Sequence, residues 1–184
     1  MSYNAPALDH THPKSSDSLR LRALPLEPPL HVVLVEPEIP QNTGNIARLC
    51  AATQCPLHLV GTLGFQIDER AVRRAGLDYW HLVELHRHLD IAHFRNSFPS
   101  CRCILLSARA HRSYLDANFQ PGDAIVFGRE SVGLPDEWLL DHPDDVYGIP
   151  TLGAVRSLNL ANAAGIIVYE ALRQIGALHH TFLG

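Results

Sequence analysis

Short apolar runs alternate with helical patterns along this chain, and that alternation is the feature that most limits its fold. Val32–Val35 has no polar interruption, as expected of a strand that is covered on both faces. Strands that alternate with helices predict an α/β domain with a mainly parallel sheet flanked by helices. The other expected strands are Leu57–Gly61, His81–Leu85, Cys103–Leu106, Ala124–Phe127 and Val146–Ile149. The expected helices are Gly44–Thr53, Glu69–Ala75, Leu89–Asn96, Asp136–Leu140 and Ser157–Ile175.

A chain of 184 residues, 46% of them hydrophobic, suffices for one domain with a sizeable core. We expect a disordered tail over residues 1–30, a single domain over 31–178 and a short tail over 179–184. No apolar run approaches the roughly 20 residues that span a bilayer, and the first 30 residues lack the apolar stretch of a signal peptide. We therefore expect no membrane association.

The cysteines and histidines show no metal-binding pattern. Cys101 and Cys103 are spaced by one residue, and no second pair stands at zinc-ligand spacing. Cys103 begins an apolar strand and is expected to be a small buried side chain. His86 and His88 are expected to point to opposite sides of a strand, which would separate them. With no disulfide framework, a cytoplasmic protein without a metal is the prediction.

Charge argues weakly against non-specific binding of nucleic acid. The chain has 15 Lys and Arg against 19 Asp and Glu, a net charge of −4. Local basic clusters exist nevertheless, and Arg70, Arg73 and Arg74 lie on one short helical segment. Such a cluster is either a solvated surface or a contact for RNA phosphates, which position a substrate without reading its sequence.

Two segments rich in Pro, Gly, Asn and Ser follow apolar strands and then open into helices. They are Glu36–Arg48 and Ile149–Asn162. Asn42 or Thr43 is a plausible N-cap for the first helix, and Ser157 and Asn159 for the last. This arrangement places backbone N–H groups and small polar side chains at helix N-termini, where oxygen-rich or anionic ligands bind. Both segments are therefore candidate parts of a binding site.

The common nucleotide-binding and hydrolase motifs are missing. The first strand-to-helix turn has one glycine rather than G-x-G-x-x-G, and neither a Walker motif nor a G-x-S-x-G elbow is present. A nicotinamide oxidoreductase therefore has little support. Gly128 ends one expected strand and Ile149 ends the next. Neighbouring strand ends of this kind suit an adenosine-like ligand, although two ordinary tight turns would give the same spacing.

Three segments together resemble the signature motifs of the SPOUT RNA 2′-O-methyltransferases. They are Asn42–Arg48, Phe127–Leu134 and Ile149–Ala163, in the order and at the separations of that family. Glu36–Pro40 and Arg73–Tyr79 further resemble the branch that methylates the wobble nucleotide, cytidine or modified uridine, of the tRNA anticodon loop. The resemblance covers about residues 31–178.

The resemblance implies an α/β domain with a deep C-terminal trefoil knot, found in homodimers that bind S-adenosylmethionine and methylate tRNA at a site built by both subunits. It places cofactor contacts at Leu106, Gly128, Ile149 and Ser157. It implies catalytic positions at Arg48, Glu130, Ser157 and Asn159. RNA contacts are expected at Asn45, Arg70, Arg73 and Arg74. The chain departs from the family at Arg129, where relatives often carry proline, and in the loop at 151–155.

Transfer of a methyl group to a ribose requires that the 2′-oxygen act as a nucleophile and be held near the methyl group. A guanidinium, with a pKa above about 12, is a poor general base. We therefore expect Arg48 to hold the target phosphate and to stabilise the developing oxyanion, with the proton leaving through phosphate or water. Glu130 is expected to have a structural role near the site. Methylation at another tRNA position or on rRNA, and a knotted RNA-binding module without activity, remain as alternatives.

Overall fold

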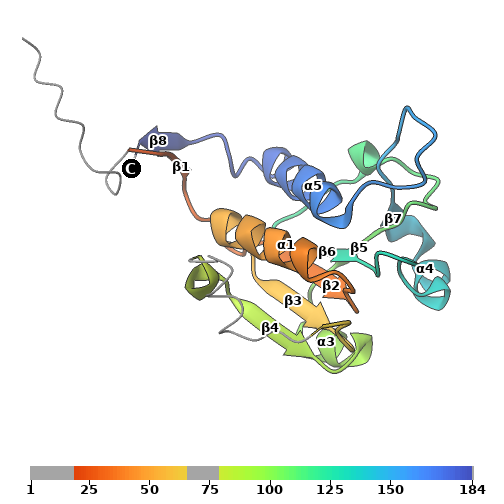
Figure 1. The fold of residues 1–184 in the computed structure, drawn as a ribbon. Coiled ribbons are helices and arrows are strands. Elements are labelled where there is room, and N and C mark those ends of the chain that lie inside the picture. The colour runs from red at the N-terminus through yellow and green to blue at the C-terminus, as the bar shows by residue number, and fades with distance from the viewer. Residues whose placement is uncertain (1–18, 66–78, 184) are drawn as a thin grey trace, which may run out of the picture.

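A parallel six-stranded sheet forms the centre of the part of the chain that the computed structural model describes, residues 19–65 and 79–183 (Figure 1). Its strand order is β4-β3-β2-β6-β5-β7, and every neighbouring pair is parallel. The strands are β2 (His31–Val35), β3 (Leu57–Val60), β4 (Leu85–His88), β5 (Cys103–Leu106), β6 (Ala124–Phe127) and β7 (Val146–Tyr147). The predicted α/β class with a mainly parallel sheet is confirmed.

Helices cover both faces of the sheet. On one face, α1 (Pro40–Thr53) lies beside α5 (Leu160–Gln174), and Ile46, Ile167 and neighbouring side chains pack on the sheet (Figure 1). On the other face, Phe94 and Trp138 from α3 (Ile91–Ser97) and α4 (Asp136–Asp141) pack on valines of the strands. Three short 3₁₀ turns complete the described helices: η1 (Trp80–Leu82), η2 (Tyr114–Asp116) and η3 (Pro143–Asp145).

The first helix starts earlier than predicted. Its first residue is Pro40, a position where proline costs nothing because the missing N–H has no helical partner. The N-cap is Ile39, whose side chain makes no capping bond. Asn42 and Thr43 are buried within the first turn instead of capping it. The predicted N-cap was therefore wrong. The predicted helix Glu69–Ala75 lies outside the described residues.

The strand predicted at His81–Leu85 was also wrong. Residues 80–82 form the η1 turn, and the strand follows at Leu85–His88. Its sequence is Leu-His-Arg-His, which lacks the apolar run of the inner strands. As β4 pairs with one neighbour only, β3, it tolerates polar side chains.

The last helix begins at Leu160, three residues later than predicted, with Asn159 as its N-cap. The Asn159 Oδ1 atom accepts bonds from the N–H groups of Ala161 and Asn162, at 2.9 and 3.4 Å. The preceding strand is shorter than predicted and ends at Tyr147.

Parts of both expected tails pair with each other. β1 (Leu21–Ala23) forms an antiparallel ribbon with β8 (Thr181–Leu183), beside the body of the domain in Figure 1. Leu30 is completely buried and belongs to the core. Residues 21–23 and Leu30, which we expected in a disordered tail, are therefore structured. The boundaries of the two tails remain a prediction.

Three histidines form a hydrogen-bonded chain across neighbouring strands. His31 Nδ1 lies 2.9 Å from His58 Nε2, and His58 Nδ1 lies 3.0 Å from His88 Nε2. His86 stacks on His58, with ring centroids 4.7 Å apart. His86 and His88 thus both contact His58, because residues two apart in a strand share a face. Their predicted opposite orientation was wrong.

Burial lowers the pKa of the three histidines that are joined by these hydrogen bonds. The pKa of His58 falls to about 2, chiefly by desolvation and then by the neighbouring histidines. Desolvation also lowers the pKa of His31, against the attraction of Glu84, and that of His88. These side chains are therefore neutral at pH 7.

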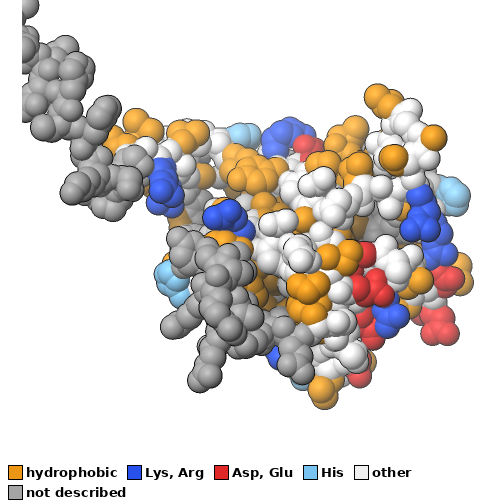
Figure 2. Space-filling view, in the orientation of Figure 1, with side chains coloured by type: hydrophobic (Ala, Val, Ile, Leu, Met, Phe, Trp, Pro, Cys, Tyr) orange, Lys and Arg blue, Asp and Glu red, His pale blue; other side chains and the backbone are white. Residues whose placement is uncertain are grey.

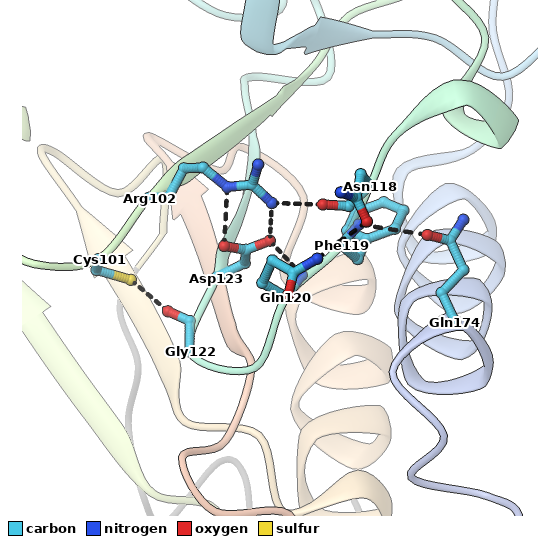
Figure 3. A network of polar contacts seen from close by, with 8 residues as sticks. All are labelled: Cys101, Arg102, Asn118, Phe119, Gln120, Gly122, Asp123 and Gln174. Carbon is cyan, nitrogen blue, oxygen red and sulfur yellow. Dashed lines mark hydrogen bonds and ion pairs between the residues drawn. The ribbon is translucent and has the colours of Figure 1, made fainter.

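A buried carboxylate ties the amino end of β6 to its surroundings (Figure 3). Both oxygens of Asp123 accept bonds from Arg102, from Nε at 3.0 Å and from Nη2 at 2.5 Å. Asp123 also accepts from the Gln120 N–H, while Arg102 donates to the Asn118 carbonyl. The bidentate pair raises the pKa of Arg102. This network fixes the loop between η2 and β6.

Replacing Asp123 with asparagine should destabilise the fold by about 1.5 kcal/mol, because one charge-assisted bond is lost and Arg102, which is partly exposed, remains hydrated. The free energy of unfolding in urea measures this loss. Asp136→Asn serves as the control, since Asp136 pairs with Arg109 at the surface. Equal stability of the Asp123 variant and the wild type would show that the network contributes nothing.

Candidate functional site

A cavity of about 1090 Å³ opens at the carboxyl ends of the central strands. The strand order reverses between β2 and β6, because β3 and β4 follow on one side of β2 while β5 and β7 lie beyond β6. Ligands of open α/β sheets bind at such a switch point. In Figure 2, acidic and basic side chains gather near this end of the molecule, around α4.

Three strand ends line the cavity: Leu106 is the last residue of β5, Gly128 directly follows β6, and Ile149 lies just beyond β7. Gly128 needs to be glycine, since a Cβ atom there would lie 2.2 Å from the backbone of Gly133 and Leu134. The backbones of Arg129 and Gly133 exchange two hydrogen bonds, of 3.1 and 2.9 Å, and close a tight turn. The strand ends predicted as cofactor contacts therefore do meet around one cavity.

Glu130 joins this turn to the start of α1. Its carboxylate accepts bonds from the N–H groups of Glu38, at 2.8 Å, and Ile39, at 3.3 Å, and from the Asn42 side chain, at 2.9 Å. These bonds satisfy donors just before the helix that no local side chain reaches. Glu130 lines the cavity, and its position fits the structural role that we expect for it.

Two further contacts connect the same pair of segments. Glu38 accepts bonds from Ser131, from its N–H and its hydroxyl, both at 2.9 Å, and these bonds lower the pKa of Glu38. Arg129 forms an ion pair with Glu36 at the end of β2. Glu130 and Ser131 thus hold the segment between β2 and α1, and Arg129 adds a partly exposed ion pair.

Asn42 is the residue of the cavity wall whose place the sequence reasoning missed. It is 4% exposed, and its amide is used at both ends: Nδ2 donates to Glu130, and Oδ1 accepts from Asn159 Nδ2 at 3.0 Å. It therefore joins all three motif segments. An asparagine at a helix start was interpreted as a cap, and its polar sequence neighbours, Gln41 and Thr43, gave no indication that its side chain would be buried.

Ser157 and Asn159 both line the cavity. Asn159 caps α5, as expected, and its side-chain amide donates to Asn42. Ser157 does not cap the helix. It lies in the segment 151–159, in which every residue is exposed.

Arg48 and Asn45 lie outside the cavity, on the exposed face of α1. The Arg48 guanidinium carbon lies 4.8 Å from the ring centroid of Tyr79, and the Tyr79 hydroxyl donates to the Gly44 carbonyl at 3.0 Å. The contact holds Arg48 against an aromatic face. The structure therefore places Arg48 outside the cavity that Glu130, Ser157 and Asn159 line.

The other predicted groups can be placed only in part. Arg70, Arg73 and Arg74 lie outside the described residues. All four cysteines are free thiols, with Cys103 half-buried at the start of β5. Among residues 19–65 and 79–183, no cluster of histidine, cysteine or acidic side chains could hold a metal ion. The helices in those ranges are too short or too polar to cross a membrane.

The fold and the switch-point cavity with the three motif segments around it define a ligand-binding protein of the α/β class, and sequence comparison assigns the family. The model of the SpoU rRNA Methylase family matches residues 29–169. The chain belongs to this family.

Curated relatives are similar over nearly their whole length. The tRNA (cytidine(34)-2′-O)-methyltransferase of Saccharophagus degradans is 47% identical over 150 residues, which cover 79% of this chain and 96% of the relative. The enzyme of the same name from Acidovorax sp. is 48% identical over 147 residues, covering 78% and 91%.

Solved structures of methyltransferases are also similar to this chain. One, described as giving insights into the 2-OH methylation of C/U34 on tRNA, is 49% identical and has a TM-score of 0.74, with 79% of this chain and 95% of that chain covered. An AdoMet-bound rRNA methyltransferase from Sinorhizobium meliloti is 26% identical and has a TM-score of 0.68, covering 81% and 57%.

Proposed function

We propose that this protein transfers a methyl group from S-adenosylmethionine to the 2′-oxygen of the wobble nucleotide, cytidine or modified uridine, in the tRNA anticodon loop. The observation that carries the proposal is the meeting of all three motif segments around one cavity at the switch point. The names of the curated relatives and the subject of the similar structure support the position on tRNA.

The cavity fits the cofactor by its chemistry. Backbone groups at Leu106, Gly128 and Ile149 offer hydrogen bonds, while Phe127 and Leu134 provide apolar surface. This combination suits an adenine ring together with polar groups. When bound, the cofactor would supply a methyl group on a sulfonium sulfur, which leaves as a neutral thioether when the carbon–sulfur bond breaks and needs no metal ion.

The protein must then provide a prepared nucleophile. Arg48 binds the phosphate next to the target ribose and stabilises negative charge on its 2′-oxygen, while the proton leaves to phosphate or water. Ser157 contacts the cofactor at the cavity wall. Glu130 and Asn159 keep the wall in place through Asn42. Asn45, one turn before Arg48, contacts RNA, as do Arg70, Arg73 and Arg74.

We propose that the working unit is a homodimer in which Arg48 serves the cavity of the partner. Arg48 lies outside the cavity of its own protomer. The exposed side of α5 carries Ile166, 38% exposed, and Tyr169, 49% exposed, which suits an interface between two copies. The family resemblance supports the same arrangement.

The resemblance also supports a trefoil knot, in which the exposed segment 151–159 and α5 belong to the knotted part. We place the reaction in the cytoplasm, in keeping with the four free thiols. We further propose that residues 31–178 form a single methyltransferase domain.

Nucleoside mass spectrometry of tRNA from a deletion strain tests the function. We expect the 2′-O-methylated nucleoside at position 34 to disappear and to return with the wild-type gene. Loss of a 2′-O-methyl group at another tRNA position or from rRNA would instead assign a different substrate.

Calorimetry with S-adenosylmethionine and S-adenosylhomocysteine tests for activity of a different class. Binding of both is expected. A protein that binds RNA but neither ligand would be a non-catalytic module, and the proposal would fail. Binding of NAD(H) in their place would indicate an oxidoreductase.

A further inference from the structure

Three arginines stand around the cavity mouth on three different loops. Arg109 follows β5, Arg129 follows β6 and Arg156 precedes α5, and all three line the cavity. None of them belongs to the set of RNA contacts proposed above. Their side chains are exposed to solvent, by 59% for Arg109 and 42% for Arg129.

The three guanidinium groups are available for a ligand to different degrees. Arg156 has no ion-pair or hydrogen-bond partner among the residues that the structure describes. Arg109 pairs with Asp136 and Arg129 with Glu36. Because these partners are 69% and 32% exposed, the two pairs are hydrated and contribute little to stability, so another anion can replace the carboxylate.

The proposed reaction dictates which anion comes to this mouth. The 2′-oxygen must enter the cavity, and the phosphates on both sides are attached to the same nucleotide. They must therefore lie at the cavity mouth when the sugar is in place. A guanidinium matches the two oxygens of a phosphate with two parallel N–H donors.

We propose that Arg109, Arg129 and Arg156 bind the RNA phosphates that flank the target nucleotide, and so position its ribose. This inference rests on the proposed function, and it adds a phosphate-binding rim within the protomer that holds the cofactor. In the free protein, Glu36 and Asp136 keep two of the arginines at the rim. In the complex, phosphates take the place of these carboxylates.

The salt dependence of RNA binding tests the rim. A fluorescent anticodon stem-loop with an unmethylated wobble cytidine is titrated with protein and S-adenosylhomocysteine at 50 to 200 mM salt. For the triple alanine variant, the slope of log affinity against log salt should be smaller in magnitude by about two, because contacts to single-stranded phosphates are lost. Each single variant should bind on the order of tenfold more weakly at low salt.

Controls separate this effect from damage to the fold. Affinity for S-adenosylhomocysteine, measured by calorimetry, should stay within about twofold of wild type, since the rim arginines are assigned to phosphates. Arg87→Ala removes an exposed arginine on β4, outside the cavity, and should retain the wild-type slope. Arg156→Lys should also retain the slope while raising KM for RNA, because charge remains but the two-pronged geometry is lost.

An unchanged slope for the triple variant, in a wild-type enzyme that methylates the stem-loop, would overturn the rim alone. A wild-type protein that neither binds nor methylates the stem-loop would overturn the proposed function, and the rim with it.

Discussion

An Arg48→Ala enzyme is expected to lose about 10²–10³-fold in kcat, as is typical when a group that stabilises a developing oxyanion is removed. Its affinity for S-adenosylmethionine should be unchanged, because Arg48 is assigned to the RNA phosphate and the 2′-oxygen rather than to the cofactor. Arg48→Lys keeps the positive charge and loses the fork, so it should remain well below wild type. The rate of methylation of a tRNA transcript by each variant, compared with wild type, measures the loss. Near-wild-type turnover by either variant would exclude this role.

Mixing two inactive variants shows in which subunit Arg48 acts. In a heterodimer of Arg48→Ala with Ser157→Ala, the intact cavity of the first chain faces the intact Arg48 of the second. If the site is shared, random mixing should restore about a quarter of wild-type activity, since half of the dimers carry one complete site. If Arg48 serves its own protomer, the mixture stays inactive.

Stability should fall steeply between pH 7 and pH 5 because of the histidine chain. In the unfolded chain these histidines bind protons near pH 6.5, whereas folding lowers the pKa of His31, His58 and His88. The unfolded state therefore binds more protons below pH 6.5, and stability is lost as the pH falls. With a folded pKa of about 2, His58 alone accounts for a loss of about 2 kcal/mol at pH 5.

Urea unfolding at pH 7.5, 6 and 5 measures this dependence. His58→Phe removes the group with the lowest pKa and should flatten the curve between pH 6.5 and 5. His111→Ala, at an exposed position, should leave it unchanged. A wild-type protein that is equally stable at pH 7.5 and 5 would contradict the account.

The sequence predicted the correct bounds for strands that are covered by apolar side chains on both faces of the sheet. Cys103–Leu106 and Ala124–Phe127 appear with the expected bounds. At the sheet edge, β4 carries His and Arg, so its pattern contains no such signal. The start of α1 was missed because its donors are satisfied by Glu130, about ninety residues further along the chain. Partners that distant leave no local pattern.

For the site, the family resemblance predicted several residues that line the cavity, although Arg48 and Asn45 lie outside it, and nothing in the sequence predicted how these residues are connected. Leu106, Gly128, Glu130 and Asn159 all line the cavity. That Asn42 bonds to both Glu130 and Asn159 depends on the pairing of β2 with β6, which periodicity does not specify. The distance of Arg48 from the cavity likewise depends on the direction of an exposed helix face.

The position of β6 in the sheet has a consequence during synthesis. One edge of β2 pairs with β3, which is made soon afterwards, but the other edge pairs with Ala124–Phe127. Until those residues leave the ribosome, an apolar strand edge in the nascent chain has no partner and is open to aggregation. We therefore expect a chain that stalls before residue 124 to be a substrate for chaperones and proteases, and the amino-terminal half not to fold independently.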